Sequence, residues 1–483
     1  MDPTDIARWQ FAITTVYHFL FVPITIGLSA MVAGYEIAWL RTRNTAWLRL
    51  TKFFGKLFLI NFAIGVVTGI VQEFQFGMNW SDYSRFVGDV FGAPLAVEGL
   101  LAFFLESTFL GLWIFGWDRI PAKLHAACMV LVHVGTLFSA YFILAANSWM
   151  QHPVGFDYNP ETGRAEMNDF AAVLLNKVQL VTFPHVVLSA YMTAAAFVVG
   201  VGFWQLRRVH RTEHAERDLP VYRRAVRTGA VLLLVSGAGV VATGDVQGKI
   251  MTEVQPMKMA AAEALWETEA PADFSVLTIG TLDGSRETFS IKIPGLLSFL
   301  ATGTTDGEVV GIDELREQYV ATYGQDPGEA YYSAGGYTPV IPLTYWTFRL
   351  MMGLGLVAMV VGAWILWATR GGRVPQGRAI MAAAASLPFL PLFANSFGWI
   401  FTEVGRQPWA VFGLMTTDRA VSPTVSTFEV TTSLVLLTLV YGLLAVVEVK
   451  LLLTYVVRGA EPIDPDHDPS APHSDDRPLA VAY

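Results

Sequence analysis

Long apolar runs, without the regular polar positions of an amphipathic helix, dominate the pattern of this chain. Stretches such as TAAAFVVGVGFW and VTTSLVLLTLVYGLLAVVEV are apolar on every side. A helix of about 20 such residues is typical of a membrane span. We therefore predict an all-α integral membrane protein, a bundle of nine transmembrane helices at residues 11–40, 54–76, 93–117, 124–149, 182–206, 226–245, 343–369, 379–403 and 424–456.

Basic residues are distributed unevenly between the two predicted membrane faces. If the N-terminus lies outside, the inner segments 41–56 and 207–227 carry many Lys and Arg, whereas the outer segments 74–93 and 404–424 carry few. Because positive residues favour the cytoplasmic side, the sequence predicts an outer N-terminus and a cytoplasmic C-terminus. The N-terminal MDPTDIARWQ begins with acids and has no cleavage site, so we expect no signal peptide.

Two polar regions divide the chain. Residues 246–342 form a long outer loop with the alternating TFSIKI, the turn signal LDGS, the helix-like IDELREQYVATY and a helical stretch from Gln255 to Glu267. The tail is rich in Pro, Asp and Ser, which predicts disorder. The predicted organisation is helices 1–6 in residues 1–245, the outer loop in 246–342, helices 7–9 in 343–456 and an acidic cytoplasmic tail in 457–483.

Composition narrows the possible cofactors. The chain is 53% hydrophobic and 15% charged, which is less charge than a soluble protein carries. Its single cysteine, Cys128, excludes an internal disulfide and any zinc or iron–sulfur site held by cysteines. No CxxCH motif is present, so any haem is bound non-covalently. The net charge of −9 comes largely from the loop and the tail, and we expect no nucleic-acid partner.

Four side chains able to ligate haem iron are predicted at one depth in the outer half of the membrane. They are His18, His185, Met351 and Glu403, from four different spans. Taken singly, each has a simpler interpretation: a histidine hydrogen-bonded to a neighbour, a methionine packed in the core, and an interfacial Glu403 paired with Arg406. The shared depth favours a metal-binding role.

Two acids lie inside the third span. Glu98 and Glu106 are separated by about 12 Å of depth and about 80° around an ideal helix. Intramembrane acids commonly mark proton paths, and Ser107, Ser139 and Asn147 could extend such a path. The alternative is a pair of acids satisfied by polar neighbours in a packed interface.

The outer loop places Lys258 and Glu263 on one predicted helix. Their spacing is too wide for an ideal i,i+4 ion pair, so each could contact a ligand at the membrane surface. The alternative is an ordinary solvated helix.

The chain resembles the large subunit, subunit I, of cytochrome bd-type quinol oxidases over about residues 5–456. The matching blocks, in order, are RWQFAITTVYHFLFVPITIG, FGKLFLINFAIGVVTGIVQEFQFGMNWS, FGAPLAVEGLLAFFLESTFLGLWIFGWDR, AANSWMQHPVG, KMAAAEALWET, FRLMMG and GWIFTEVGRQPW. The separation between Glu263 and the seventh span resembles that of members with a short quinol-binding loop, or Q loop.

The resemblance implies a terminal oxidase of the prokaryotic cytoplasmic membrane. Such an enzyme oxidises ubiquinol or menaquinol at the outer face. It reduces dioxygen to water with cytoplasmic protons, which builds a proton gradient without a pump. The family carries two haem b groups and one chlorin, haem d. Its large subunit pairs with a second membrane subunit, sometimes joined by a small single-helix subunit.

The resemblance also assigns roles to individual residues. His185 and Met351 match the axial ligands of the low-spin haem b. His18 and Glu403 match the ligands of the two high-spin haems; we favour His18 for haem d, and the choice stays open. The remaining matches are Glu98 and Glu106 for the haem d site and its proton supply, Lys258 and Glu263 for quinol, and Arg349, Trp399, Arg406, Gln407 and Glu73 beside the haems.

Two other functions are compatible with parts of the sequence. A haem b electron-transfer subunit would need only the His185/Met351 pair, and its reduced form would not bind carbon monoxide. A secondary transporter could use Glu98 and Glu106 to bind a proton, and it would be colourless.

Overall fold

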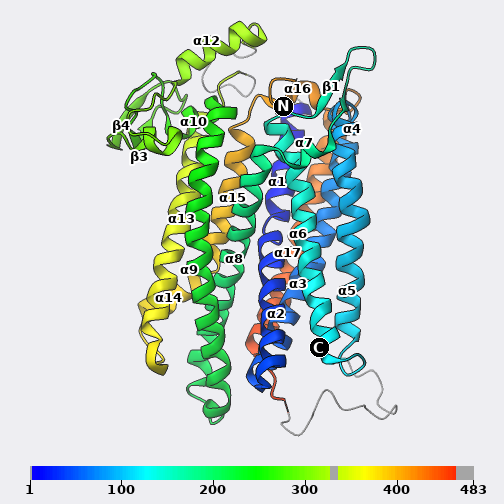
Figure 1. The fold of residues 1–483 in the computed structure, drawn as a ribbon, viewed down its shortest axis with the longest axis vertical. Helices are drawn as coiled ribbons and strands as arrows, with labels where there is room; N and C mark the ends of the chain where they lie inside the picture. Colours follow the sequence, from blue (N-terminus) through cyan, green and yellow to red (C-terminus); the bar gives the residue numbers. More distant parts are fainter. Residues whose placement is uncertain (1–2, 327–335, 464–483) are drawn as a thin grey trace.

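The computed structural model describes residues 3–326 and 336–463, which form a tall bundle of helices (Figure 1). Within these ranges, nine helical segments are long and apolar enough to cross a membrane, which confirms the predicted fold class. The start of the chain and the loop between the sixth and seventh spans lie at the same end of the bundle, the top of Figure 1. We call this end the loop face and the other end the opposite face.

Most of the spans are continuous helices, and three are interrupted beside a proline. α1 (Pro3–His18) and α2 (Val22–Thr42) form the first span, with Pro23 at the start of α2. The third span contains Pro94 near the end of α4 (Ser81–Val97), then the π-helical η1 (Glu98–Phe103) and α5 (Phe104–Phe115). Pro388 precedes α15 (Phe389–Val404), which follows α14 (Arg378–Ser386) in the eighth span. Proline removes a backbone donor, so each break follows from the local sequence. The continuous spans are α3 (Thr45–Met78), α6 (Ala122–Gln151), α8 (Lys177–Val209), α9 (Ala215–Val254), α13 (Ile341–Ala368) and α17 (Thr427–Arg458).

The sixth span extends back through the basic stretch before residue 226, as the sequence allows, and forward beyond the predicted end at residue 245. α9 includes the basic stretch before residue 226 and continues to Val254, into the predicted outer loop. The predicted helix end at residue 245 is therefore wrong. Glycines such as Gly244 are tolerated inside a helix, and the chain bends only at Gln255, just before Pro256.

Small residues hold the centre of the bundle together. A Cβ added at Gly27 of α2 would lie only 2.3 Å from Cβ of Ala194 in α8. Close approach of this kind is the usual way in which membrane helices gain packing energy, because lipid gives no hydrophobic drive for helices to associate. Leu28 and Ala195, the residues next to this contact in the chain, are fully buried.

The loop between α9 and α13 folds over the loop face. It contains α10 (Pro256–Glu263), β3 (Phe274–Gly280), β4 (Glu287–Ile293), α11 (Leu296–Thr302) and α12 (Ile312–Tyr323), and residues 327–335 lie outside the described ranges. The predicted strand TFSIKI, the LDGS turn and the helix IDELREQYVATY are confirmed. The helix predicted to reach Glu267 ends at Glu263 because Ala264 turns into a left-handed conformation, with φ of 51°.

Short elements complete the loop face, and one short turn follows the seventh span. They are β1 (Phe156–Asn159), β2 (Arg164–Met167), α7 (Phe170–Leu174), β5 (Trp409–Val411), β6 (Met415–Thr416), α16 (Thr417–Ala420) and the turn η2 (Arg370–Gly372) after α13. The strands of the described ranges form only two-stranded antiparallel ribbons: β1 with β2, β3 with β4, and β5 with β6.

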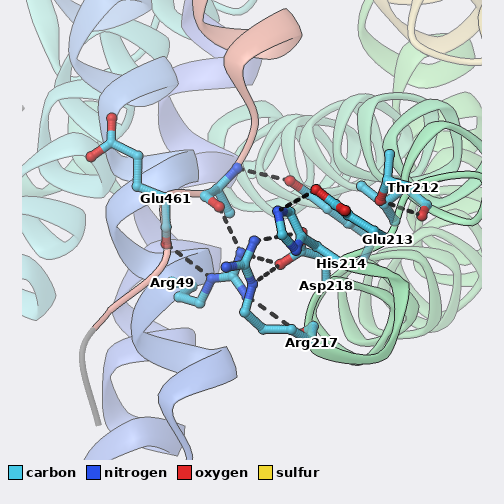
Figure 2. Close-up of polar contacts among 10 residues, drawn as sticks. Arg49, Thr212, Glu213, His214, Arg217, Asp218 and Glu461 are labelled. Atoms are coloured by element: carbon cyan, nitrogen blue, oxygen red, sulfur yellow. Dashed lines mark hydrogen bonds and ion pairs between the residues drawn. The ribbon is translucent and has the colours of Figure 1, made fainter. Parts of the chain in front are cut away.

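On the opposite face, Arg49 of α3 fixes the end of the last span (Figure 2). Its guanidinium donates to the backbone oxygens of Ala460 at 2.7 Å and Glu461 at 2.9 Å, and it pairs with Asp218 at 2.8 Å. The backbone N–H of Ala460 donates to the Tyr222 hydroxyl at 2.8 Å. The chain is therefore held just beyond α17. The rest of the predicted tail, residues 464–483, lies outside the described ranges.

Candidate functional site

A large cavity lies near the loop face between α8, α9, α13 and α15. Its volume is about 1320 Å³ when the open mouth is included. His185 of α8 and Met351 of α13 both line it, as do Trp399 and Phe19, whose rings meet edge to face at 4.9 Å. A concave, mostly apolar site with a few convergent polar groups is typical of a cofactor pocket.

The hydrogen bonds of His185 leave one ring nitrogen available for a metal. Its Nδ1 lies 3.0 Å from the Thr243 hydroxyl, which donates its own proton to the backbone oxygen of Gly239 at 2.8 Å. The hydroxyl must therefore accept a hydrogen bond from Nδ1–H, so Nε2 keeps its lone pair. Metal-binding histidines usually donate their second ring N–H in this way.

His18, at the break between α1 and α2, has the same arrangement. Its Nδ1 lies 2.9 Å from the Thr68 hydroxyl, and that hydroxyl donates to the backbone oxygen of Ile64 at 3.0 Å. Nδ1 is again the protonated nitrogen, and Nε2 again keeps its lone pair. A Cβ added at Gly69 would lie 3.1 Å from the imidazole, so the absence of a side chain there leaves space for this ring.

Two other histidines in the spans use both ring nitrogens. His133 bonds Ser29 through Nδ1 and the Tyr191 hydroxyl through Nε2, each at 3.0 Å. His125 contacts Glu36 through Nδ1 at 2.5 Å and donates from Nε2 to a backbone oxygen at 2.8 Å. These two fit the simpler interpretation of a histidine satisfied by its neighbours. The histidines predicted as iron ligands do not.

Glu403 is one end of a continuous hydrogen-bond chain that reaches the loop. Lys258 donates to Gln151 at 2.5 Å, Gln151 donates to Asn147 at 3.0 Å, and Asn147 donates to Oε1 of Glu403 at 3.0 Å. The other oxygen of Glu403 forms an ion pair with Arg406. The ion pair predicted as the simpler interpretation of Glu403 is therefore present, together with a connection to Lys258 in the loop between α9 and α13.

Lys258 and Glu263 are buried, so the alternative of a solvated helix is wrong. Lys258 is 3% exposed and lines the cavity, and burial lowers its pKa to about 7. Glu263 is 4% exposed and pairs with Arg349 at 2.6 Å. Burial raises the pKa of Glu263, and the neighbouring guanidinium opposes that rise. As predicted from their spacing, the two side chains do not pair with each other.

Arg349 and Arg406 each keep buried donors that have no protein partner. Within the described ranges, Nε and Nη1 of both residues are buried without a hydrogen bond. A buried donor without a partner needs an explanation, and a bound group that accepts its hydrogen bonds is one. An anionic group with several oxygens, such as a haem propionate, fits such donors, because guanidinium groups bind carboxylates in paired geometry. The donor set therefore fits a haem.

The acids of the third span lie beside α6. Glu98 accepts a hydrogen bond from Ser139 at 2.6 Å, and Glu106 is 7% exposed and packs so closely on Gly135 that a Cβ there would lie 2.6 Å from it. The predicted 80° between the two acids does not hold, because η1 is a π-helical turn rather than an ideal α-helix. Such turns are frequent at functional sites.

Other predicted residues have different positions. Glu73 is exposed on α3, within electrostatic range of Glu98. Gln407 bonds the backbone of Glu403 at 3.3 Å and accepts from Thr417 at 2.8 Å, so its amide is used inside its own loop. Ser107 bonds only its own helix, at the backbone oxygen of Phe104, and Asn147 joins Glu403 rather than the acids.

Three residues that position the site were not predicted: Thr68, Thr243 and Gln151. The threonines carry no sequence signal, because their role depends on contacts between helices. Gln151 had a signal, since AANSWMQHPVG places two amides four residues apart and therefore on one face of a helix.

Comparisons with known proteins identify the family of the chain. The family model described as "Cytochrome bd terminal oxidase subunit I" matches residues 6–460. The chain is 46% identical over 472 residues to "Cytochrome bd ubiquinol oxidase subunit 1" of Bacillus subtilis, covering 97% of this chain and 96% of that protein. It is 38% identical to "Cytochrome bd-II ubiquinol oxidase subunit 1" of Escherichia coli, covering 95% and 97%.

A solved structure has the same fold. The bd oxidase from Geobacillus thermodenitrificans superposes with a TM-score of 0.82 at 26% identity, covering 95% of this chain and 99% of that chain. The family model matches residues 6–460, a range that includes the nine candidate spans of the described residues apart from residues 3–5, so the chain is a multi-pass membrane protein of the bacterial cytoplasmic membrane. The resemblance found in the sequence is thereby confirmed, and the chain belongs to the cytochrome bd terminal oxidase subunit I family.

Proposed function

We propose that this chain is the catalytic subunit of a quinol oxidase that oxidises membrane quinol at the loop face and reduces dioxygen to water. The protons for water come from the opposite, cytoplasmic face, so a gradient forms without a pump. The observation that carries this proposal is the matched state of His18 and His185, each of which donates from Nδ1 to a threonine and keeps the Nε2 lone pair. Relatives named ubiquinol oxidases support the substrate class.

The residues fit three haem sites. His185 and Met351 would hold a low-spin haem b in the cavity between α8 and α13. His18 and Glu403 would each hold a high-spin haem, one of them haem d, with His18 favoured for haem d. When bound, the haems supply electron transfer and dioxygen binding. Arg349 and Arg406 would bind propionates through their buried, unpartnered donors, and Trp399 would pack beside a ring.

Quinol would bind where the loop meets the cavity. Lys258 lines the cavity and is neutral above about pH 7, so it can accept a proton as quinol is oxidised. Glu263 stays paired with Arg349 and would contact the second quinol hydroxyl. We propose a short Q loop, in line with the separation of Glu263 from α13.

Proton supply from the opposite face would use the acids of the third span. Glu98 and Glu106 lie on the same side of that span, facing α6, and Ser139 already donates to Glu98. Glu73 is close enough to Glu98 to interact with it electrostatically. These groups can accept and release protons, whereas the apolar residues around them cannot.

The subunit would act with others. We propose a heterodimer with a second membrane subunit, to which a small single-helix subunit can be added. The exposed apolar side chains of α17, such as Phe428, Leu439 and Leu443, face either that subunit or lipid.

Oxygen uptake by the purified complex tests the proposed function. Added quinol should start oxygen consumption, the reduced-minus-oxidised spectrum should show haem b together with a chlorin band, and the reduced complex should bind carbon monoxide. A complex that contains haem b but neither consumes oxygen nor binds carbon monoxide would instead be a haem b electron-transfer subunit without its own oxygen site. A colourless complex would exclude both functions.

A further inference from the structure

The β3–β4 hairpin of the loop exposes its apolar face. Phe289, Ile291 and Ile293 alternate along β4 and are 52%, 50% and 45% exposed. Ile279, which pairs opposite Phe289 on β3, is 50% exposed. A ribbon on a soluble surface turns its apolar residues inward. This hairpin therefore presents an apolar surface that no described part of the chain covers.

The polar side of the hairpin is satisfied within the protein. Glu287 accepts from Ser290 at 3.0 Å and pairs with Lys292 at 3.1 Å. Ser275 of β3 lies 2.8 Å from the hydroxyl of Tyr345, which belongs to α13. The polar side chains are thus directed to one another and to the bundle, and the apolar face is left without partners.

The hairpin extends along the outer end of α13. Its turn meets the first residue of that helix, because a Cβ at Gly284 would lie 3.3 Å from Ile341. Its base lies deeper, since the ring centre of Phe274 is 4.7 Å from the Arg349 guanidinium. Ile341 and Arg349 are about 12 Å apart along the helix axis. Figure 1 shows β3 and β4 at the edge of the bundle, beside the upper end of α13 and below α12.

This depth corresponds to the membrane interface. α13 has 28 residues and is about 42 Å long, whereas the hydrocarbon core is about 30 Å thick. The hairpin therefore reaches the level at which the helix enters the bilayer. Leu343 and Trp346, on the same outer end of α13, are 43% and 41% exposed, and tryptophan at this depth is typical of the interface. Phe299 of α11 adds another exposed ring near Lys249 of α9.

We propose that the apolar face of the β3–β4 hairpin rests on the lipid surface at the loop face, at the boundary between headgroups and acyl chains. A two-stranded ribbon has unpaired backbone groups along both edges, so it cannot enter the hydrocarbon core. The interface, which offers water to the edges and acyl chains to the apolar side chains, suits both requirements. The hairpin thereby holds the loop against the membrane beside α9 and α13.

Site-directed fluorescence on the whole oxidase complex tests this contact. Ile291→Cys on the apolar face and Ser290→Cys on the other face are made in a Cys128→Ser background and labelled with bimane. The complexes are placed in phosphatidylcholine vesicles that contain lipid with a nitroxide near the headgroup. Because neighbouring residues of a strand point to opposite sides, the two labels differ in little except direction.

The label at residue 291 should be quenched several-fold more by the nitroxide lipid than the label at residue 290, and aqueous iodide should quench the label at residue 291 little. Equal quenching at both sites, or stronger iodide quenching at residue 291, would overturn the lipid contact. Protection of residue 291 from both quenchers would also overturn it, in favour of cover by another subunit. An unchanged haem spectrum verifies folding, and Phe289→Cys replaces Ile291→Cys if that variant does not assemble.

Discussion

Buried arginines differ between the two ends of this molecule. On the opposite face, Arg49 uses all three of its nitrogens: Nε donates to Glu461, Nη1 to Arg217, and Nη2 to Asp218 and Ala460. Near the loop face, Arg349 and Arg406 each pair one nitrogen with a glutamate. Their Nε and Nη1 atoms are buried without a partner in the described ranges.

The difference separates groups that complete the fold from groups that await a ligand. A buried donor without a partner costs about 1–3 kcal/mol. The four such donors of Arg349 and Arg406 therefore favour the binding of a group that accepts their hydrogen bonds. The histidines repeat the contrast, since His125 and His133 are satisfied through both ring nitrogens, whereas His18 and His185 each keep one lone pair. Arg49 is therefore satisfied by the protein itself, whereas Arg349 and Arg406 keep donors that a bound group could use.

The largest effect is expected from Arg49. Arg49→Met breaks a buried ion pair and releases two backbone oxygens at the end of α17, which should cost about 3–5 kcal/mol of stability. Thermal unfolding of the purified complex should shift to a lower temperature. The haem spectrum of the fraction that folds should not change.

Arg217→Met is the matched control. Arg217 also pairs with Asp218, at 2.9 Å, but its side chain is 48% exposed. An exposed pair is worth only about 0–1 kcal/mol. A similar loss of stability in both variants would show that burial of Arg49 is not what fixes α17.

A smaller effect, in a different quantity, is expected from Arg349. Arg349→Met should weaken haem retention about 10–100-fold, as loss of supporting groups commonly does at metal sites. The ratio of haem to protein after extended detergent dialysis measures this. Full haem retention with a lower unfolding temperature would place Arg349 in the same structural class as Arg49 and would abolish the contrast.

Gln151 tests whether the hydrogen-bond chain from Lys258 to Glu403 matters. Gln151→Leu leaves the buried Lys258 ammonium without its acceptor and the Asn147 amide oxygen without its donor, at a cost of about 1–3 kcal/mol, so we expect KM for quinol to rise about tenfold. Gln247→Leu is the control, because Gln247 lines the same cavity and bonds only Thr182. Equal changes in both variants would mean that the cavity wall, and not the chain, sets quinol affinity.

The last effect is a pH dependence of stability. In the folded protein Lys258 loses its proton above about pH 7, whereas in the unfolded chain it keeps that proton up to about pH 10.4. Its burial therefore destabilises the fold below about pH 7, and this cost fades as pH rises. Lys258→Met should raise the unfolding temperature, relative to the unchanged protein, more at about pH 6 than at about pH 9. A difference that is the same at both pH values would mean that Lys258 keeps its charge when buried.

Local patterns in the sequence predicted much of the fold. The spans and the strand TFSIKI follow from apolar periodicity, which neighbouring residues determine. The orientation of the apolar face of that strand was not predictable, because this face points away from the protein and not into its core. The pairing of Glu403 with Arg406 was predicted, but the threonines at His18 and His185 and the contact of Asn147 with Glu403 were not. Each of these unpredicted contacts depends on how helices distant in sequence meet.

The low-spin site at His185 tests the central claim most directly. In the reduced-minus-oxidised spectrum of the purified complex, His185→Ala should remove the low-spin haem b band. The high-spin signals assigned to the sites of His18 and Glu403 should be largely retained. A low-spin band that persists unchanged in this variant would contradict the assignment of the cavity between α8 and α13 as a haem site.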